Sequence, residues 1–258
     1  MNGVSLFGMV SLSLALTACV PLVSMGSPAT TGPPTVTAPL RPVAAHRTTT
    51  LAVNVPAEFE VVQMIISLAP GTFSVVQTHG GSSYLTVLEG EITLRPVTGA
   101  EQKVKAGDSA LQAPGEFAQV GNTGTVTAQY VSSILLPKGG TITTQQDPTA
   151  PQPAGLTTSA HTFAVPQPTA SFDVVQFTLT FAPGAMTPLH THGGQANVTV
   201  LDGAITFASN GVTMTHPAGE SFTEGVNEVG QAMNIGNTPA KVVAVFLLPK
   251  GAVLTTNQ

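Results

Sequence analysis

The chain has 258 residues, of which only 8% are charged, and a formal net charge of −5 with eight Lys and Arg in total. So few cations exclude a basic patch for nucleic acid, and the lack of Trp with only two Tyr argues against a base-stacking surface. The sequence contains 26 Gly and 21 Pro. Because these residues interrupt helices, the composition favours β structure with many turns. The length suggests two domains of ordinary size.

The N-terminus contains an apolar run typical of a signal peptide. Residues 4–16 have the length of a signal-peptide core and are short for a membrane-spanning helix. They lead into Leu16-Thr17-Ala18-Cys19, which resembles the bacterial lipobox, whose cysteine is lipidated and becomes the first mature residue. We therefore expect a signal peptide at 1–18, lipidation of Cys19, and an exported protein held at the membrane of the cell envelope. Met1-Asn2-Gly3 carries no Lys or Arg, so a plain signal peptide, an uncleaved anchor and a buried N-terminal strand are the alternatives.

The rest of the sequence contains one pattern twice. Residues 59–63 (FEVVQ) recur 113 residues later as 172–176 (FDVVQ). After one deletion, residues 135–139 (LLPKG) recur 112 residues later as 247–251. Each copy reads as short strands rich in Val, Ile and Phe, separated by Pro-Gly, Asp-Gly or Glu-Gly turns. A repeat this long indicates two copies of one domain, and the turns favour an all-β sandwich or barrel.

Two stretches rich in Pro and Thr set the expected domain boundaries. Residues 19–50 predict an extended tether and residues 147–158 a linker, because such sequences bury too little apolar surface to fold. The two copies are then expected at residues 51–146 and 159–258.

The second copy contains the most distinctive chemical pattern, His190 and His192. Residues i and i+2 of a strand face the same way, so two imidazoles can meet at one point, which is half of a common metal site. Gln77 and His79 stand at these positions in the first copy. A Gln carbonyl oxygen is a poor ligand for Zn, Cu or Fe. We therefore expect any metal in the second copy and none in the first; the alternative is that both sets are only hydrogen-bonded histidines.

Both copies resemble cupin domains, and the chain resembles a bicupin. The first cupin motif runs Gly, five residues, His-x-His, three or four residues, Glu, six residues, Gly. The second copy matches it at Gly184, His190, His192 and Gly203, with Ala196 in place of the glutamate. The first copy matches it at Gly71, His79 and Gly90, with Gln77 and Ser83 in place of the first histidine and the glutamate. The resemblance implies two tandem antiparallel β-barrels of the jelly-roll (double-stranded β-helix) type, the first with a vestigial site.

The second cupin motif, which supplies a third histidine and an asparagine, is weaker. Asn122 and Asn234 match its asparagine, but Ala118 and Gly230 stand in place of its histidine. A rival alignment with an insertion puts Met233 at the histidine position instead. We prefer the ungapped alignment.

The resemblance implies one divalent transition metal (Fe, Mn, Zn, Ni or Cu), for which the second copy retains two of four ligands. Glu228 is our candidate for an added ligand because it lies two residues before Gly230 and would share its inward face on a regular strand. Its counterpart in the first copy is Glu116, and the alternative is that both are solvated rim residues. Met186, Gln231 and Asn234 are candidate pocket residues.

Three functions are compatible with these residues. The first is an exported bicupin that binds a small molecule or a metal in its C-terminal barrel. The second is a metal-dependent, dioxygenase-like oxidoreductase, and the third a non-catalytic structural or interaction module with vestigial sites. The missing ligands favour the first and third over the second, and the retained histidine pair favours the first over the third. Fold alone does not decide, because cupins support many chemistries.

Overall fold

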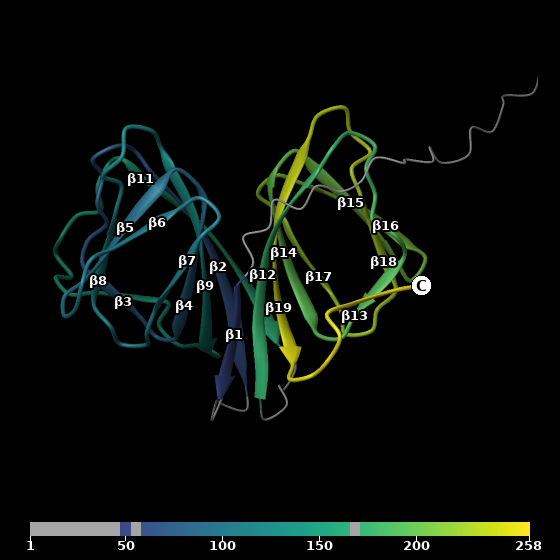
Figure 1. Ribbon diagram of the computed structural model, residues 1–258, viewed down its shortest axis with the longest axis horizontal. Helices are drawn as coiled ribbons and strands as arrows, with labels where there is room; N and C mark the ends of the chain where they lie inside the picture. The colour runs from purple at the N-terminus through teal and green to yellow at the C-terminus, as the bar shows by residue number, and fades with distance from the viewer. Residues whose placement is uncertain (1–46, 53–57, 166–170) are drawn as a thin grey trace, which may run out of the picture. The chain divides into compact units, whose positions relative to one another are not determined.

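The computed structural model describes residues 47–52, 58–165 and 171–258, which form strands, turns and loops without a helix (Figure 1). Within these residues no helix is long and apolar enough to cross a bilayer. The expected signal peptide, Cys19 and the tether up to residue 46 lie outside the described residues. Residues 47–50 of the expected tether belong to strand β1.

Two five-stranded antiparallel sheets build the N-terminal barrel. Their strand orders are β11-β2-β9-β4-β7 and β10-β3-β8-β5-β6. The strands are β2 (Phe59–Leu68), β3 (Gln77–His79), β4 (Ser82–Glu89), β5 (Glu91–Pro96), β6 (Gln102–Lys105), β7 (Ser109–Gln112), β8 (Ala118–Gly121), β9 (Ala128–Pro137), β10 (Thr143–Gln145) and β11 (Leu156–Val165).

The C-terminal barrel repeats this arrangement. Its sheets have the orders β1-β12-β19-β14-β17 and β16-β15-β18-β13-β20. The strands are β1 (Arg47–Ala52), β12 (Ser171–Phe181), β13 (His190–His192), β14 (Gln195–Asp202), β15 (Ala204–Ser209), β16 (Val212–Pro217), β17 (Ser221–Glu224), β18 (Gly230–Met233), β19 (Ala240–Pro249) and β20 (Thr255–Asn257). The predicted all-β fold of two tandem jelly-roll barrels is confirmed.

Each barrel takes its outermost strand from the segment that precedes the other barrel in sequence. Strand β1 pairs with β12, from Arg47 opposite Gln176 to Ala52 opposite Ser171. Strand β11 pairs with β2 along its whole length. Residues 159–165, expected in the C-terminal copy, therefore complete the sheet of the N-terminal barrel.

The two barrels share a buried interface. Phe59 and Phe172, which are equivalent in the repeat, stack with their ring centroids 5.7 Å apart and their planes at 8°. Polar side chains also cross the interface. Gln63 Nε2 donates to the carbonyl oxygen of Asn197 at 2.8 Å, and Thr199 Oγ1 donates to Gln63 Oε1 at 2.6 Å. Buried amides and hydroxyls are stable when they are paired in this way, so the contact is specific as well as apolar.

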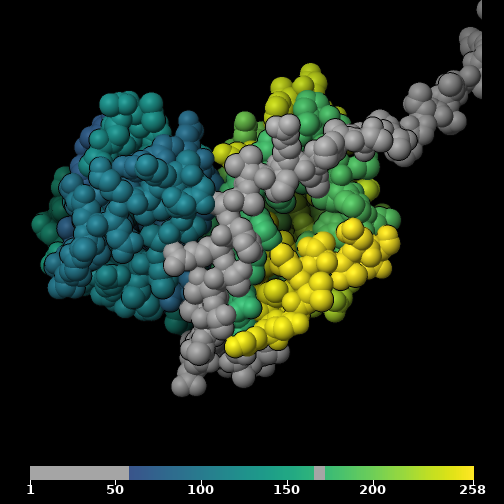
Figure 2. All heavy atoms as spheres, in the orientation of Figure 1, coloured from purple at the N-terminus to yellow at the C-terminus, as the bar shows by residue number. Residues whose placement is uncertain are grey.

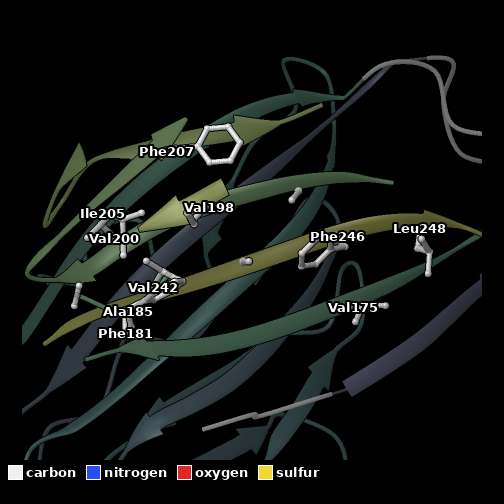
Figure 3. Packing of buried hydrophobic residues seen from close by; sticks show 14 residues of the cluster. Val175, Phe181, Ala185, Val198, Val200, Ile205, Phe207, Val242, Phe246 and Leu248 are labelled. Carbon is white, nitrogen blue, oxygen red and sulfur yellow. The ribbon is translucent and has the colours of Figure 1, made fainter. Parts of the chain in front are cut away.

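The core of the C-terminal barrel comes from alternate residues of facing strands (Figure 3). Phe181, Val198, Ile205, Val242 and Phe246 belong to one buried cluster. The C-terminal strand β20 pairs with the short strand β13, and residues near the C-terminus lie at the surface of this barrel (Figure 2). This pairing places β13, with its two histidines, between β18 and β20.

Candidate metal centre

His190 and His192 project from β13 toward one point inside the C-terminal barrel. Each is only 6% exposed, and their Nε2 atoms lie 3.0 Å apart. Their Nδ1 atoms are 2.9 Å from the carbonyl oxygens of Pro188 and Leu254, respectively. The expected convergence of these two imidazoles is therefore present in the structure, and the backbone fixes the orientation of both rings.

These hydrogen bonds determine which ring nitrogens are free to bind a cation. A carbonyl oxygen only accepts, so each Nδ1 carries the hydrogen and each neutral ring presents the lone pair of Nε2. Two lone pairs directed at each other across 3.0 Å repel unless a proton or a cation lies between them. Metal-binding histidines in proteins are commonly oriented in this way, by a carbonyl that accepts from the other ring nitrogen.

Glu224, the last residue of β17, completes the cluster. Its Oε2 atom lies 3.2 Å from His192 Nε2 and 3.7 Å from His190 Nε2, and its side chain is buried. The ligand atoms of the three residues all lie within 4.8 Å of one another, and the described residues contain no other group of three such side chains. Two imidazoles and a carboxylate are a donor set that suits Fe, Mn, Zn and related divalent metals.

The two kinds of side chain in the cluster shift each other's proton affinity. The neighbouring carboxylate of Glu224 raises the pKa of His190, which burial alone would lower. Burial raises the pKa of Glu224, but its interactions with the imidazoles of His190 and His192 outweigh this effect and leave the pKa below its usual value. The carboxylate is therefore ionised at neutral pH and ready to ligate a cation.

The cluster forms part of the wall of a cavity of about 550 Å³ in the C-terminal barrel. Most of the wall is apolar and includes Phe177, Leu179, Phe181, Val198, Phe222 and Phe246. Cavities of this size, apolar with a few convergent polar groups, are typical of small-molecule sites.

Comparison with known families assigns the fold. The cupin domain family matches residues 64–134 and 177–246, which together are more than half of the chain. This chain belongs to the cupin family. No protein of known, curated function matches its sequence.

Solved cupin structures resemble this bicupin at low sequence identity. An oxalate decarboxylase from Bacillus subtilis is similar over 82% of this chain and 73% of that chain, with a TM-score of 0.56 and 14% identity. A formate complex of the oxalate decarboxylase from Lactobacillus farciminis is similar over 86% of both chains, with a TM-score of 0.52 and 15% identity. At these identities the similarity shows the fold alone.

The cupin motif explains where Glu224 comes from. Ala196 occupies the position of the cupin glutamate, and the structure pairs Ala196 directly with Glu224 across β14 and β17. Directly paired residues of antiparallel strands project from the same face, with Cβ atoms about 4.5–5.5 Å apart. The neighbouring strand therefore supplies a carboxylate to the face from which the cupin glutamate would project.

Glu224 was not among the residues expected from the sequence, because it lies on β17, outside the strands that carry the two cupin motifs. One feature of the repeat does point to it. The offset of 112 residues aligns Glu224 with Gln112, so the carboxylate appears only in the copy that also has both histidines.

Glu228, the favoured third ligand, lies elsewhere. Its carboxylate accepts hydrogen bonds from Ser209 Oγ, from Asn210 Nδ2 at 3.2 Å and from the backbone N–H of Gly225 at 2.7 Å. Strand β18 begins only at Gly230, and Asn227 has a left-handed φ of 57°. Glu228 is thus part of a turn, where the alternation of a regular strand does not apply. Its counterpart Glu116 holds the equivalent turn through the N–H of Ala113 at 3.0 Å.

The three candidate pocket residues are not among those that line the cavity. Gln231 Nε2 donates to the carbonyl oxygen of Thr187 at 2.8 Å and lies 3.7 Å from the Met186 sulfur. Asn234 Nδ2 donates to the carbonyl oxygens of Phe181 and Thr238, as Asn122 Nδ2 does to those of Leu68 and Val126. These matching bonds support the ungapped alignment of the second cupin motif.

The position of the third cupin histidine is closed in this chain. Gly230 stands there, and a Cβ atom on it would lie 2.4 Å from Cζ of Phe207. No side chain fits this position unless the Phe207 ring moves, so the cluster has at most two imidazole ligands.

The first cupin barrel replaces the cluster by neutral groups. His79 Nδ1 is 2.9 Å from the carbonyl oxygen of Ile142, and burial lowers the pKa of this imidazole. Ser83 Oγ bonds to Ser132 Oγ at 2.7 Å. Gln112, the counterpart of Glu224, donates to the carbonyl oxygen of Gln77 at 3.1 Å. The side chains of His79, Ser83 and Gln112 are thus engaged in hydrogen bonds within the barrel, and this set lacks a carboxylate.

Proposed function

We propose that this chain is an exported cupin protein that holds a divalent transition metal through His190, His192 and Glu224 and binds a small molecule beside it. The observation that carries the proposal is the convergence of these three buried side chains in the wall of a largely apolar cavity. Removing a carboxylate and two imidazoles from water costs free energy unless they are paired or ligate a cation.

Each residue has a definite role in this proposal. The Nε2 atoms of His190 and His192 and a carboxylate oxygen of Glu224 would hold the metal. The carbonyl oxygens of Pro188 and Leu254 orient the imidazoles. The largely apolar walls lower the local dielectric constant, which strengthens electrostatic interactions at the site. When bound, a metal of this class supplies a Lewis acid and, if it is Fe, Mn or Cu, redox chemistry.

A metal-dependent, dioxygenase-like oxidoreductase is the second candidate. Two histidines and one carboxylate with open positions are the ligand set of non-haem iron oxygenases. Glu228 was the carboxylate expected from the sequence for this set. The carboxylate that lies beside both imidazoles is that of Glu224. The third candidate, a structural module with vestigial sites, gives these buried donors no role.

Export and the lipid anchor are supported by the sequence of the N-terminus. The apolar run at 4–16, the lipobox-like Leu16-Thr17-Ala18-Cys19 and the Pro- and Thr-rich tether fit a lipoprotein of the cell envelope. The protein would then act in the periplasm or outside the cell, with a small-molecule ligand and the membrane as its partners.

Metal analysis of the purified chain tests the proposal. We expect about one metal ion per chain in the wild type, and a loss of most of it in His190→Ala and Glu224→Gln. His79→Ala and Glu228→Gln are matched controls, because they change a histidine and a glutamate outside the cluster. Equal metal content in all five proteins would contradict the assignment of the site.

A further inference from the structure

We propose that the cavity of the C-terminal barrel binds a small molecule with a single oxyanion head, such as a carboxylate, and an uncharged, apolar body. This inference rests on the proposed function, because it takes a divalent cation to be held by His190, His192 and Glu224. It goes further by specifying the charge and the shape of the ligand.

The cavity wall at the cluster carries a net positive charge when a divalent cation is bound. Each imidazole then ligates as a neutral ring, since its Nδ1 donates to a carbonyl oxygen and the lone pair of its Nε2 faces the cluster. A divalent cation beside the single carboxylate of Glu224 therefore leaves one net positive charge. A buried charge is costly unless it is paired, so the site favours a ligand that brings one negative charge.

The remaining wall of the cavity carries no charged side chain within the part of the chain that the structure describes. Among the described residues that line the cavity there is no Lys or Arg, and Glu224 is the only acid. The other polar side chains of the lining, Thr187, Thr255 and Asn257, are neutral. A second anionic group on the ligand would have no cation to meet inside the barrel. The cavity therefore discriminates against dicarboxylates.

The cavity also has room for an apolar body. The cavity of about 550 Å³ is walled by Phe177, Leu179, Val242, Ala244 and Phe246, among other apolar residues. Burying apolar surface favours binding, so the body of a ligand would add to affinity along this wall.

The first barrel has larger residues at two positions of this wall. Tyr130 stands where the second barrel has Val242, and Val120 where it has Ala232. Both belong to the buried core of the N-terminal barrel. The smaller Val242 and Ala232 belong to the buried cluster of the second copy and also line its cavity. The copy with the full His, His and Glu cluster therefore has the smaller residues at these two positions.

The test uses three matched probes on the full-length chain loaded with Co²⁺. Calorimetry measures the binding of each probe, and the visible absorption of Co²⁺ reports whether the probe contacts the metal. Hexanoate has one carboxylate and an apolar body, adipate has the same six carbons with a carboxylate at both ends, and hexan-1-ol has the body without the charge. We expect hexanoate to bind at least about 10-fold more tightly than either of the others and to change the Co²⁺ spectrum. Val242→Tyr copies Tyr130 and should weaken hexanoate binding by at least about 10-fold while Co²⁺ remains bound.

The outcomes separate this inference from the proposed function. If Co²⁺ is bound but adipate binds as tightly as hexanoate, or hexanoate leaves the spectrum unchanged, the inference about the ligand is overturned and the metal site stands. If Val242→Tyr keeps Co²⁺ and binds hexanoate like the wild type, the cavity is not the site of the body. If the wild type does not bind Co²⁺, the proposed function is wrong. The cluster then has no net positive charge to attract an oxyanion, so the inference about the ligand is overturned as well.

Discussion

Ala196 and Glu224 are directly paired across the antiparallel strands β14 and β17. Ala196 stands where the cupin motif has a glutamate, and Glu224 lies beside both imidazoles of the cluster. Because paired residues project from the same face of a sheet, a carboxylate on either strand can approach the same point. In this chain the carboxylate on that face of the sheet therefore comes from β17, the strand that pairs with the one carrying the motif position.

This relationship predicts a rescue. Glu224→Ala should lower metal affinity by more than about 100-fold, because it removes a direct ligand. Adding Ala196→Glu should restore much of this affinity, since the deleted side chain leaves room for a carboxylate from β14. Metal titration of the wild type, the single variant and the double variant measures the effect. A double variant no better than Glu224→Ala would show that the two positions are not interchangeable.

The first barrel should gain a metal site through two substitutions. Gln77→His and Gln112→Glu together reproduce the His, His and Glu set around His79, whose Nδ1 is already held by the carbonyl of Ile142. We expect a second metal ion per chain in the double variant, counted by elemental analysis. The carboxylate at position 112 cannot donate to the carbonyls of Gln77 and Glu116, as Gln112 now does. The metal-free variant should therefore be less stable by about 1–3 kcal/mol. A single equivalent of metal in the double variant would contradict the proposed equivalence of the two sites.

Acid should destabilise the N-terminal barrel through His79. Burial lowers the pKa of His79 below its usual 6.5, so the unfolded chain binds a proton at a higher pH than the folded chain does. The stabilising contribution of neutral His79 is complete above pH 6.5 and is lost as the pH falls through the lower, folded pKa. Thermal melts of the wild type and His79→Gln between pH 7.5 and pH 5 compare the two slopes. We expect the wild type to lose more stability over this range than the variant; equal slopes would exclude His79 as the titrating group.

Lipidation of Cys19 predicts incorporation of a fatty acid. In cells that process lipoproteins, the wild type should be labelled by an added fatty acid, whereas Cys19→Ala should remain unlabelled. Detergent extraction should then release the wild type from membranes. Labelling of both proteins, or of neither, would remove the anchor from the proposal.

Much of the fold was predictable because it follows from local patterns. The repeat from Phe59 to Phe172, the turn dipeptides and the short β-branched runs predict two β-barrels, and the spacing of His190 and His192 predicts two converging imidazoles. Glu224 was not predictable in the same way, because its place depends on the register between two strands. Glu228 was favoured on the assumption of a regular strand, but a turn with Asn227 in the left-handed region interrupts it. The exchange of β1 and β11 depends on pairing between distant segments, which no local pattern encodes.

The most direct test of the account is a crystal structure of the full chain with Co²⁺, in which anomalous scattering at the metal edge locates the ion. We predict one anomalous peak per chain, bonded to Nε2 of His190, Nε2 of His192 and a carboxylate oxygen of Glu224. A peak beside Glu228 or His79, or an ion bound to both imidazoles with Glu224 turned away, would contradict the assignment of Glu224 as the carboxylate ligand of this cupin.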